Sequence, residues 1–529
     1  MSLYKSRKAR AAPEFLERVF TVPDPERTTL AKLEKQLGKD LDHFLTESKV
    51  AGEIPLGELA NSFKDSSIPD EPRFVQDQVD YLMTQVIPYC VNTGSPKFIG
   101  HMTSAIPYFL QSLSKCMVAL HQNVVKIETS RSFTFLERQT LAMMHRLIYD
   151  REDSFYDEHI HKRNSTLGIQ CSGGTVANMM GLWIARNTWM EKVLGSEAAE
   201  EGLIEALIKS GKKNICIFVS QRGHYSLRKA CDLLGMGKSQ MRVIPVDVGH
   251  KINLELLKVE YQKALAENIQ PIALIGVAGT TETGHFDPLN ELADFAEEHQ
   301  LHFHVDAAWG GGLLFSSKHR SVLKGCERSD TMVIDGHKQM YLPMGVGMLL
   351  TKDPELAKAI EHKAQYIIRE GSFDLGRRHL EGSRPGMALL THSALHILGR
   401  QGYELLINHN MDLAYRFSEL IESHAEFELI TKPETNILTY RYFPSAWKEK
   451  RTTDLDDKVS KLNLLLQKKQ RESGKSFVSR TSFRHPEPKG TPITVLRSVL
   501  ANPLTKPEHL SEILSEQVEI GESLLQQLL

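Results

Sequence analysis

The sequence predicts an α/β fold with a mostly parallel central sheet, preceded by a helical segment and followed by a small α+β domain. Between residues 165 and 350, short apolar runs alternate with amphipathic helical stretches, a pattern typical of βαβ units. The chain has 529 residues, 41% apolar and 25% charged, which suits a globular protein with a large core. Lys and Arg number 64 against 66 Asp and Glu, so the overall charge favours neither nucleic acid nor a membrane surface as partner.

The N-terminal segment, residues 1–95, is charged and predicted to be helical. Residues 30–45 and 73–87 place apolar side chains at helical spacing, and the proline-containing stretch 67–72 connects them. The basic start of the chain leads into no apolar h-region, and the six cysteines include no C-x-x-C pair. We therefore expect a cytoplasmic protein without a secretory signal, a disulfide framework or a structural metal site.

The central region, residues 96–385, is predicted to hold the sheet and the ligand site. Apolar runs predict strands at 214–220, 241–247, 271–279, 301–308, 331–336 and 345–351. Helices are predicted between them at 224–235, 254–267 and 288–300. Because ligands bind at the carboxyl ends of parallel strands, the chemistry is expected just after these runs.

The C-terminal region, residues 386–529, is predicted to form a smaller α+β domain. Helical patterns cover 387–406 and 408–424, and strand patterns cover 427–432, 436–443 and 493–500. The highly charged stretch 444–490 is predicted to be in part a solvated loop.

Three features point to one chemistry. Asp306 ends a predicted strand, Lys338 follows the next one, and a glycine turn at 172–175 opens a helical run. Glycines and free N–H groups at a helix start form an anion site, and no G-K-[ST] follows that would make it a Walker loop. A phosphate cradle, a lysine for a Schiff base and an aspartate for a pyridine nitrogen are what pyridoxal phosphate requires. His224, after the strand 214–220, is placed to cover the ring of that cofactor.

These motifs resemble the group II pyridoxal-phosphate-dependent decarboxylases, the family of glutamate, aromatic amino-acid and histidine decarboxylases. SGGTVAN, GHYSLRKA, AGTTETGHFDP, HVDAAWGGG, the His-Lys pair and LRSVLANP occur in family order and span residues 95–505. Within the family, the chain most resembles the bacterial aspartate 1-decarboxylases that use this cofactor. The resemblance implies the fold-type I architecture of the aspartate aminotransferase-like enzymes. It also implies a homodimer with shared active sites, in which residues 1–95 take part.

The resemblance implies a role for each matching residue. Lys338 would bind the cofactor as a Schiff base, and Asp306 would pair with its ring nitrogen. Ala308 and His224 would lie against the two faces of the ring, with Thr281 and Asp287 beside it. The phosphate would be held by Gly173, Gly174, Thr175 and His337, with Asn178 assisting. The α-carbon would be reprotonated by Tyr366, on a mobile loop from the partner subunit, or by His224.

The same resemblance assigns the substrate contacts. Arg497 would bind a substrate carboxylate, with His101 and Thr103 as polar contacts and Arg384 supporting the active-site loop. His101 is bulkier than the glutamine usual in glutamate decarboxylases, which favours aspartate over glutamate. The expected reaction is α-decarboxylation of L-aspartate to β-alanine, a precursor of pantothenate and coenzyme A. One departure from the family is Asp335-Gly336 where many relatives have Asn-Pro, which brings negative charge near the phosphate.

Several alternatives stay open from the sequence alone. The nearest is glutamate decarboxylation to γ-aminobutyrate, and an aminotransferase or a carbon–carbon lyase would use the same cofactor. His302, His304 and Asp306 alternate along one strand and could instead form the H-x-H site of a metal-dependent hydrolase. A non-catalytic dimeric scaffold is the remaining alternative.

Overall fold

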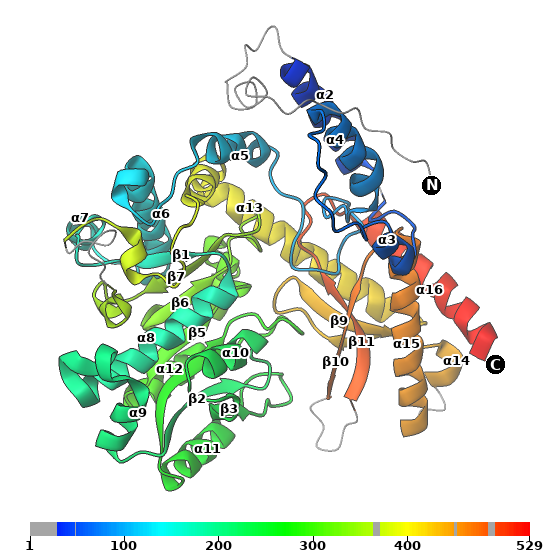
Figure 1. Cartoon of the computed structure of the whole chain (residues 1–529). Coiled ribbons are helices and arrows are strands. Elements are labelled where there is room, and N and C mark those ends of the chain that lie inside the picture. The colour runs from blue at the N-terminus through cyan, green and yellow to red at the C-terminus, as the bar shows by residue number, and fades with distance from the viewer. Residues whose placement is uncertain (1–28, 48, 363–370, 449–451, 485–491, 529) are drawn as a thin grey trace.

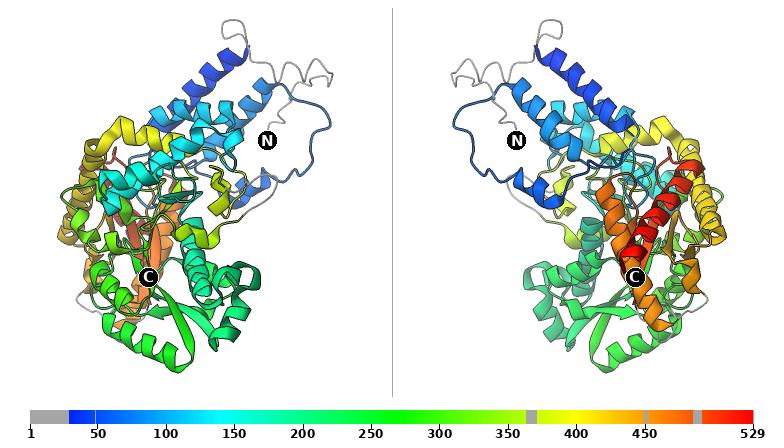
Figure 2. Two further views of the ribbon diagram at one scale, coloured as in Figure 1. Left: turned by 90° about the vertical axis from the view of Figure 1, so that its left-hand side faces the viewer. Right: turned by 90° about the vertical axis from the view of Figure 1, so that its right-hand side faces the viewer.

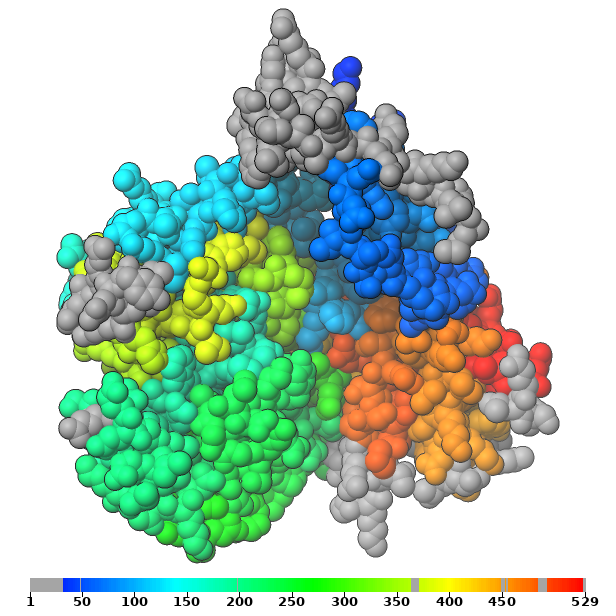
Figure 3. Space-filling model, viewed as in Figure 1, coloured from blue at the N-terminus to red at the C-terminus, as the bar shows by residue number. Residues whose placement is uncertain are grey.

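The computed structural model describes residues 29–47, 49–362, 371–448, 452–484 and 492–528. A larger part surrounds a seven-stranded sheet and a smaller part surrounds a four-stranded sheet (Figure 1). The N-terminal helices lie beyond both sheets, at the top of the molecule in the two side views and over the smaller part in the space-filling view (Figures 2 and 3). None of the described helices is long and apolar enough to cross a membrane.

The seven-stranded sheet confirms the predicted α/β class. Its strand order is β1-β7-β6-β5-β4-β2-β3; β3, β2, β4, β5 and β6 are parallel, and β7 is antiparallel to both β6 and β1. Every strand except β7 therefore ends at the same edge of the sheet. The strands are β1 (Gly168–Cys171), β2 (Asn214–Ser220), β3 (Met241–Ile244), β4 (Ile269–Val277), β5 (His302–Asp306), β6 (Thr331–Ile334) and β7 (Gly347–Thr351).

Helices cover both faces of this sheet because its strands are apolar on both sides. Along β2, Phe218 joins the core under α6, α11 and α12, whereas Ile217 and Val219 join the core under α8 and α10. Successive side chains of a strand point to opposite faces, so one strand supplies both cores. These helices are α6 (Ser132–Tyr149), α8 (Gly174–Leu194), α10 (Tyr225–Leu233), α11 (Leu254–Ala266) and α12 (Leu289–Glu298).

The smaller part is an antiparallel sheet in the order β10-β11-β9-β8, with α15 packed on β11 and against α16. Leu462 and Leu466, one turn apart in α15, are fully buried in its core. Its elements are β8 (Phe427–Thr431), β9 (Ile437–Tyr442), β10 (Ser479–Arg484), β11 (Pro492–Val499), α14 (Ser445–Lys448), α15 (Thr453–Ser473) and α16 (Pro507–Leu528). The other described α-helices, apart from α13, are α2 (Thr29–Thr46), α3 (Leu56–Asn61), α4 (Val75–Tyr81), α5 (Phe109–Leu120), α7 (Asp153–His159) and α9 (Ala198–Ser210).

Helix α13 (Ala388–Ser423) connects the two parts. Its first half places Tyr403 in the core of the larger part, and its second half places Phe417 in the core of the smaller part. Gly399 interrupts the helix with a φ of 61°, a backbone conformation that glycine adopts without strain. Since one helix serves both cores, the domain limits at residues 95 and 385 stay a prediction.

Three segments differ from the sequence-based prediction. Residues 168–171 form β1, where no strand was predicted. The strand has only four residues and leads through a short polar turn into α8. The two helices expected at 387–406 and 408–424 form the single kinked helix α13. The charged stretch 444–490 contains α14, α15 and β10, because the apolar positions of α15 are few but correctly spaced for one buried face.

Candidate active site

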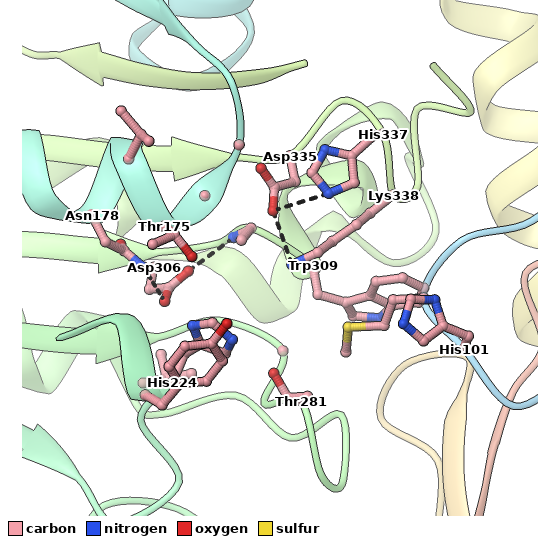
Figure 4. A pocket seen from close by; sticks show the side chains of 18 of the residues that line it. His101, Thr175, Asn178, His224, Thr281, Asp306, Trp309, Asp335, His337 and Lys338 are labelled. Carbon is pink, nitrogen blue, oxygen red and sulfur yellow. Dashed lines mark hydrogen bonds and ion pairs between the residues drawn. The ribbon is translucent and has the colours of Figure 1, made fainter. Parts of the chain in front are cut away.

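One cavity of about 540 Å³ lies at the edge where the parallel strands end, between the larger and the smaller part (Figure 4). Its wall includes residues that follow β1, β2, β4, β5 and β6, together with one residue of β11. The predicted site residues that line it are His101, Gly173, Gly174, Thr175, Asn178, His224, Thr281, Asp306, Ala308, Asp335, His337, Lys338 and Arg497. The fold therefore brings nearly the whole predicted set to one place.

The glycine turn forms the start of α8 at the cavity wall. Gly173 precedes the helix and caps it with no side-chain hydrogen bond. A Cβ at Gly174 would lie 2.7 Å from the Asp335 carboxylate and 3.2 Å from Ala308, so a larger residue does not fit there. The first N–H groups of a helix lack partners within it, and the helix dipole adds positive potential. This end of α8 is suited to hold a phosphate.

Asp306, the last residue of β5, is 5% exposed at the cavity wall. Its Oδ2 accepts a 2.9 Å hydrogen bond from Nδ2 of Asn178, and its Oδ1 accepts one of 3.2 Å from the backbone N–H of Ala308. Two donors fix the orientation of this buried carboxylate. Asn178, which was expected to assist the phosphate, is instead hydrogen-bonded to Asp306.

Asn178 belongs to a continuous chain of buried hydrogen bonds. Its Nδ2 also donates to Ser226 Oγ at 3.0 Å, and Ser226 Oγ lies 2.8 Å from Nδ1 of His224. Its Oδ1 lies 2.9 Å from Nε2 of His304, whose Nδ1 lies 2.8 Å from Thr331 Oγ1. Because an amide oxygen only accepts, His304 carries its proton on Nε2. Burial lowers the pKa of His304 to about 3, so this ring is neutral at physiological pH.

These hydrogen bonds occupy the histidine nitrogens that the alternative H-x-H metal site would need. Both ring nitrogens of His304 are hydrogen-bonded, and Nε2 of His302 lies 2.8 Å from the same Thr331 hydroxyl. In the described part of the chain, no three His, Cys, Asp or Glu side chains are grouped so that they could hold a metal ion. The alternating histidines therefore act as hydrogen-bonding core residues.

His224 stands at the N-terminus of α10 and caps it. Its Nδ1 accepts a 3.3 Å hydrogen bond from the backbone N–H of Ser226, which leaves Nε2 as the nitrogen that carries the proton of the neutral ring. Burial lowers the pKa of His224; the charge of Asp306 opposes this effect, and that of Lys338 adds to it. His224 therefore faces the cavity as a neutral imidazole that can donate through Nε2.

Lys338 forms an ion pair in the cavity wall. Its Nζ lies 3.0 Å from Oδ2 of Asp335, and Nε2 of His337 lies 3.7 Å from the same oxygen (Figure 4). Nδ1 of His337 donates to the carbonyl of Val346 at 3.0 Å, which fixes its ring. The departure from Asn-Pro therefore places a carboxylate beside both the lysine and the glycine turn.

Two guanidinium groups line the cavity. Arg497 is anchored by hydrogen bonds to Ser479 Oγ at 3.0 Å, to the carbonyl of Thr281 at 2.7 Å and to that of Gly100 at 3.2 Å. Burial lowers the pKa of Arg497 to about 10, so it keeps its charge at neutral pH. Arg222, which the sequence did not single out, is paired at 2.6 Å with Glu282.

The two polar residues predicted near the substrate lie side by side. Nδ1 of His101 is 2.8 Å from the hydroxyl of Thr103. Burial lowers the pKa of His101, and the positive charges of Arg497, Lys338 and His337 lower it further. His101 lines the cofactor cavity, whereas Thr103 lines a neighbouring apolar cavity of about 1010 Å³.

Two further predicted residues, Asp287 and Arg384, lie outside the cavity wall. Asp287 is buried outside the cavity and accepts hydrogen bonds from the backbone N–H groups of Ile252 and Val277, so it holds a loop. Arg384 forms a buried ion pair with a residue of α6 and is likewise not part of the cavity wall. Tyr366 lies outside the described residues.

Comparison with known proteins decides the family. A model of the pyridoxal-dependent decarboxylase conserved domain matches residues 57–443, most of the chain. The chain belongs to the pyridoxal-dependent decarboxylases. This decarboxylase is 48% identical over 526 residues to the aspartate 1-decarboxylase of Aliivibrio fischeri (strain ATCC 700601 / ES114). The alignment covers 98% of this chain and 96% of that protein.

Two further relatives agree. The human acidic amino acid decarboxylase GADL1 is 30% identical over 375 residues, which are 70% of this decarboxylase and 67% of the human protein. The crystal structure of mouse CSAD has the same fold, with a TM-score of 0.80 at 24% identity over 92% of this chain and 99% of the mouse chain. The expected fold-type I architecture and the recognised family are both confirmed.

The cavity of the decarboxylase fits pyridoxal 5′-phosphate, the cofactor of its family. It combines a helix N-terminus that admits only glycine at 174, a lysine and a carboxylate oriented by two donors. Nε1 of Trp309, in the same wall, is buried and has no hydrogen-bond partner within the described part of the chain. The volume of about 540 Å³ is of the size that small-molecule and cofactor sites have.

Sequence reasoning missed Ser226 and Arg222, and it expected a different partner for Asn178. Ser226 is two positions after His224, which is the spacing of a helix cap and was a usable signal. Asn178 lies on the same face of α8 as Gly174 but one turn farther from the free N–H groups at the helix start, and there its amide meets Asp306. Arg222 and Glu282 carried no signal, because a charge pair formed between two loops cannot be read from either loop alone.

Proposed function

We propose that this decarboxylase removes the α-carboxylate of acidic amino acids, with L-aspartate preferred, and releases carbon dioxide and β-alanine. The observation that carries the proposal is the nearly full-length identity of 48% to a protein named aspartate 1-decarboxylase. A charged, anchored guanidinium in the cavity wall, that of Arg497, agrees with a carboxylate substrate because it can bind both carboxylate oxygens.

The proposed roles follow the positions of the side chains. Lys338 would hold the cofactor covalently, and the carboxylate of Asp306 would pair with its ring nitrogen. Gly173, Gly174, Thr175 and His337 would hold the phosphate, while Ala308, Thr281 and His224 would contact the ring. When bound, pyridoxal phosphate supplies an electron sink that stabilises the negative charge left on the α-carbon. The hydrogen bonds of Asn178 support this arrangement because they keep Asp306 in one orientation.

His224 is proposed to deliver a proton through Nε2. Its Nδ1 is occupied by Ser226, so only the other ring nitrogen can exchange a proton with a ligand in the cavity. Tyr366, on the proposed catalytic loop of the partner subunit, stays a second proposed proton donor. Closure of such a loop would exclude water and suppress protonation at the wrong atom.

His101 is proposed to shorten the substrate pocket. Its ring is held against Thr103 and stays neutral, since burial and neighbouring cations lower its pKa. A smaller side chain there would leave room for one more methylene, which is the difference between aspartate and glutamate. Discrimination by one methylene is worth about 10- to 200-fold in an apolar pocket.

The deciding experiment measures products, not only turnover. Purified protein with added cofactor is given L-aspartate, L-glutamate or L-cysteine sulfinate, and carbon dioxide and the amine product are quantified. We expect β-alanine from aspartate with the highest kcat/KM, and loss of both activity and the visible absorbance of the lysine-bound cofactor in Lys338→Ala. Lys352→Ala is the control because Lys352 lies outside the cavity wall.

The products distinguish the proposed reaction type from the proposed substrate. Dominant γ-aminobutyrate would keep the decarboxylase and replace aspartate by glutamate as substrate. A 2-oxo acid formed from the substrate without amine product would instead favour an aminotransferase, because the amino group is then transferred and the carboxylate retained. His101→Gln is expected to lower the aspartate-to-glutamate ratio of kcat/KM about tenfold. An unchanged ratio would contradict the role given to His101.

A homodimer with shared active sites is also proposed. The apolar cavity between α2 and the larger part is lined in part by His337 and Lys338. A second copy of the protein that packs against this cavity would therefore contact the candidate active site. Val118, Leu120 and Tyr108 on and beside α5 are 79%, 54% and 62% exposed. Light scattering after size exclusion should give twice the mass of 59.8 kDa, and Val118→Glu should shift it toward one chain.

The cytoplasm is proposed as the location. All six cysteines are unpaired, and Cys171, Cys216, Cys231 and Cys326 are buried. Free buried thiols are stable in a reducing compartment. Fractionation with a compartment-specific marker tests this proposal.

A further inference from the structure

Asp335 introduces a negative charge into the wall of the phosphate cradle. Its side chain is 4% exposed, and its Oδ2 would lie 2.7 Å from a Cβ at Gly174, at the N-terminal end of α8. Its Oδ1 is buried without a hydrogen-bond partner among the residues that the structure describes, and it would lie 2.8 Å from a Cβ at Gly347. A carboxylate therefore already lies at the end of α8 that attracts a phosphate.

Lys338 balances this charge. Its Nζ is 3.0 Å from Oδ2 of Asp335, and the ring of His337 is the other basic group within 4 Å in the described part of the chain. The remaining cations of the cavity wall are engaged elsewhere: Arg222 is paired with a glutamate, and Arg497 binds three uncharged oxygens. The carboxylate of Asp335 thus depends on one ammonium group, the same one that the cofactor requires.

We propose that Asp335 weakens the hold of this protein on the phosphate of its cofactor. The inference rests on the family cofactor and on the proposed place of its phosphate at residues 173–175, and it does not depend on the substrate. Two anions side by side in a buried site repel each other strongly, because little water screens them. An asparagine of nearly the same shape at 335 would remove one of these charges and could donate an N–H to the phosphate.

Asp335 also neutralises the charge of Lys338 when no cofactor is bound. The Lys338–Asp335 pair satisfies the ammonium group before any cofactor arrives. Binding of a phosphate must compete with this pair instead of meeting an unpaired lysine. The protein should therefore release its cofactor more readily than a variant with a neutral side chain at this position.

The test compares ligands with and without a phosphate. Pyridoxamine 5′-phosphate and pyridoxamine lack the aldehyde, so neither can bond to Lys338, and their dissociation constants can be followed by ligand fluorescence. The ratio of the two constants measures what the phosphate contributes. We expect Asp335→Asn to raise this ratio tenfold or more in favour of the phosphorylated ligand. An unchanged or smaller ratio would overturn the inference.

Two further variants serve as a control and as a second test of the result. Glu355→Gln removes a carboxylate from an exposed pair with Lys358 of the same i,i+3 spacing, 2.9 Å apart, and should leave the ratio unchanged. Asp335→Ser provides a second neutral side chain should the Asn variant lose its circular dichroism, and it should raise the ratio in the same direction. Because no decarboxylation is measured, a wrong substrate assignment would leave these results untouched.

Discussion

The side-chain amide of Asn178 donates a 2.9 Å hydrogen bond to the carboxylate of Asp306, and this contact joins helix α8 to the end of β5. The same amide accepts from His304 and donates to Ser226, so its orientation is determined from three sides. One residue near the start of α8 thus links the carboxylate proposed for the cofactor ring to the histidine proposed to cover it.

We expect Asn178→Ala to weaken cofactor binding. The change removes one of the two donors that hold the Asp306 carboxylate, and a hydrogen bond to a charged group is worth about 1.5–3 kcal/mol, or about 10- to 150-fold. The dissociation constant for pyridoxal phosphate should rise within that range, measured by absorbance titration. Asn187→Ala is the matched control, because Asn187 lies in the same helix but donates to the carbonyl of Ala359. Equal effects of both variants would contradict the prediction.

Arg497→Lys is expected to raise KM for aspartate by about 10- to 100-fold, with a smaller effect on kcat. A lysine offers one point charge and cannot replace the two parallel N–H donors of a guanidinium. Three hydrogen bonds now hold the guanidinium in place, and a lysine would lose most of them. Steady-state kinetics check this, with Arg480→Lys on the neighbouring strand β10 as control, since Arg480 is exposed. A KM change no larger than in the control would rule out a substrate contact.

The strand ends could be predicted from the sequence because the strands are apolar on both faces. Such runs are visible in one sequence, and the residues that follow them must lie at one edge of the sheet. Lys338 and Asp306 were found in this way. The fold around them followed from strand–helix alternation, whereas α15 was missed because charged residues outnumber its buried ones.

The hydrogen-bonded chain behind the site could not be predicted. Asn178, His304 and Thr331 come from three elements, and their contacts depend on the register of β5 and β6 with α8. The alternation of His302 and His304 suggested metal ligation, because polar residues on one strand face give the same pattern whether they bind a metal or each other. Register, which decides between these, is a property of the folded sheet.

Acid is expected to destabilise the protein below about pH 6.5. Burial lowers the pKa of His145 to about 4 and that of His304 to about 3, from 6.5. The unfolded chain then binds more protons, so stability is greatest above 6.5 and falls as pH decreases, by up to about 1.4 kcal/mol per pH unit for each histidine. Asp287, whose pKa burial raises to about 7, offsets one histidine between pH 7 and 4.

Urea unfolding at pH 7.5, 6.5 and 5.5 checks the sign of this dependence. Several other histidines have a lowered pKa, including the half-buried His224 and the buried His285 and His379, so the net slope should stay positive. His145→Gln should reduce the slope because it removes one of the contributing groups. Stability that is constant or rises toward pH 5.5 would contradict the prediction.

The buried ion pair of Arg384 and Glu137 should matter for stability and not for cofactor binding. Arg384 donates through both terminal nitrogens to Glu137, one of these hydrogen bonds being 2.7 Å long, and the side chains are 7% and 2% exposed. Arg384→Met leaves the carboxylate buried and unpaired, which costs about 3–5 kcal/mol. The thermal midpoint of unfolding should fall clearly, while the dissociation constant for pyridoxal phosphate in the folded variant stays the same.

The double variant Arg384→Met, Glu137→Leu gives the sharper test of the ion pair. Replacing a buried pair by apolar side chains of similar size is often neutral or stabilising, because neither charge then has to be desolvated. We therefore expect the double variant to recover most of the thermal midpoint that Arg384→Met loses. No recovery would mean that Arg384 stabilises the protein through its packing, or through a contact other than Glu137. A changed cofactor affinity in the folded double variant would instead connect this pair to the active-site loop.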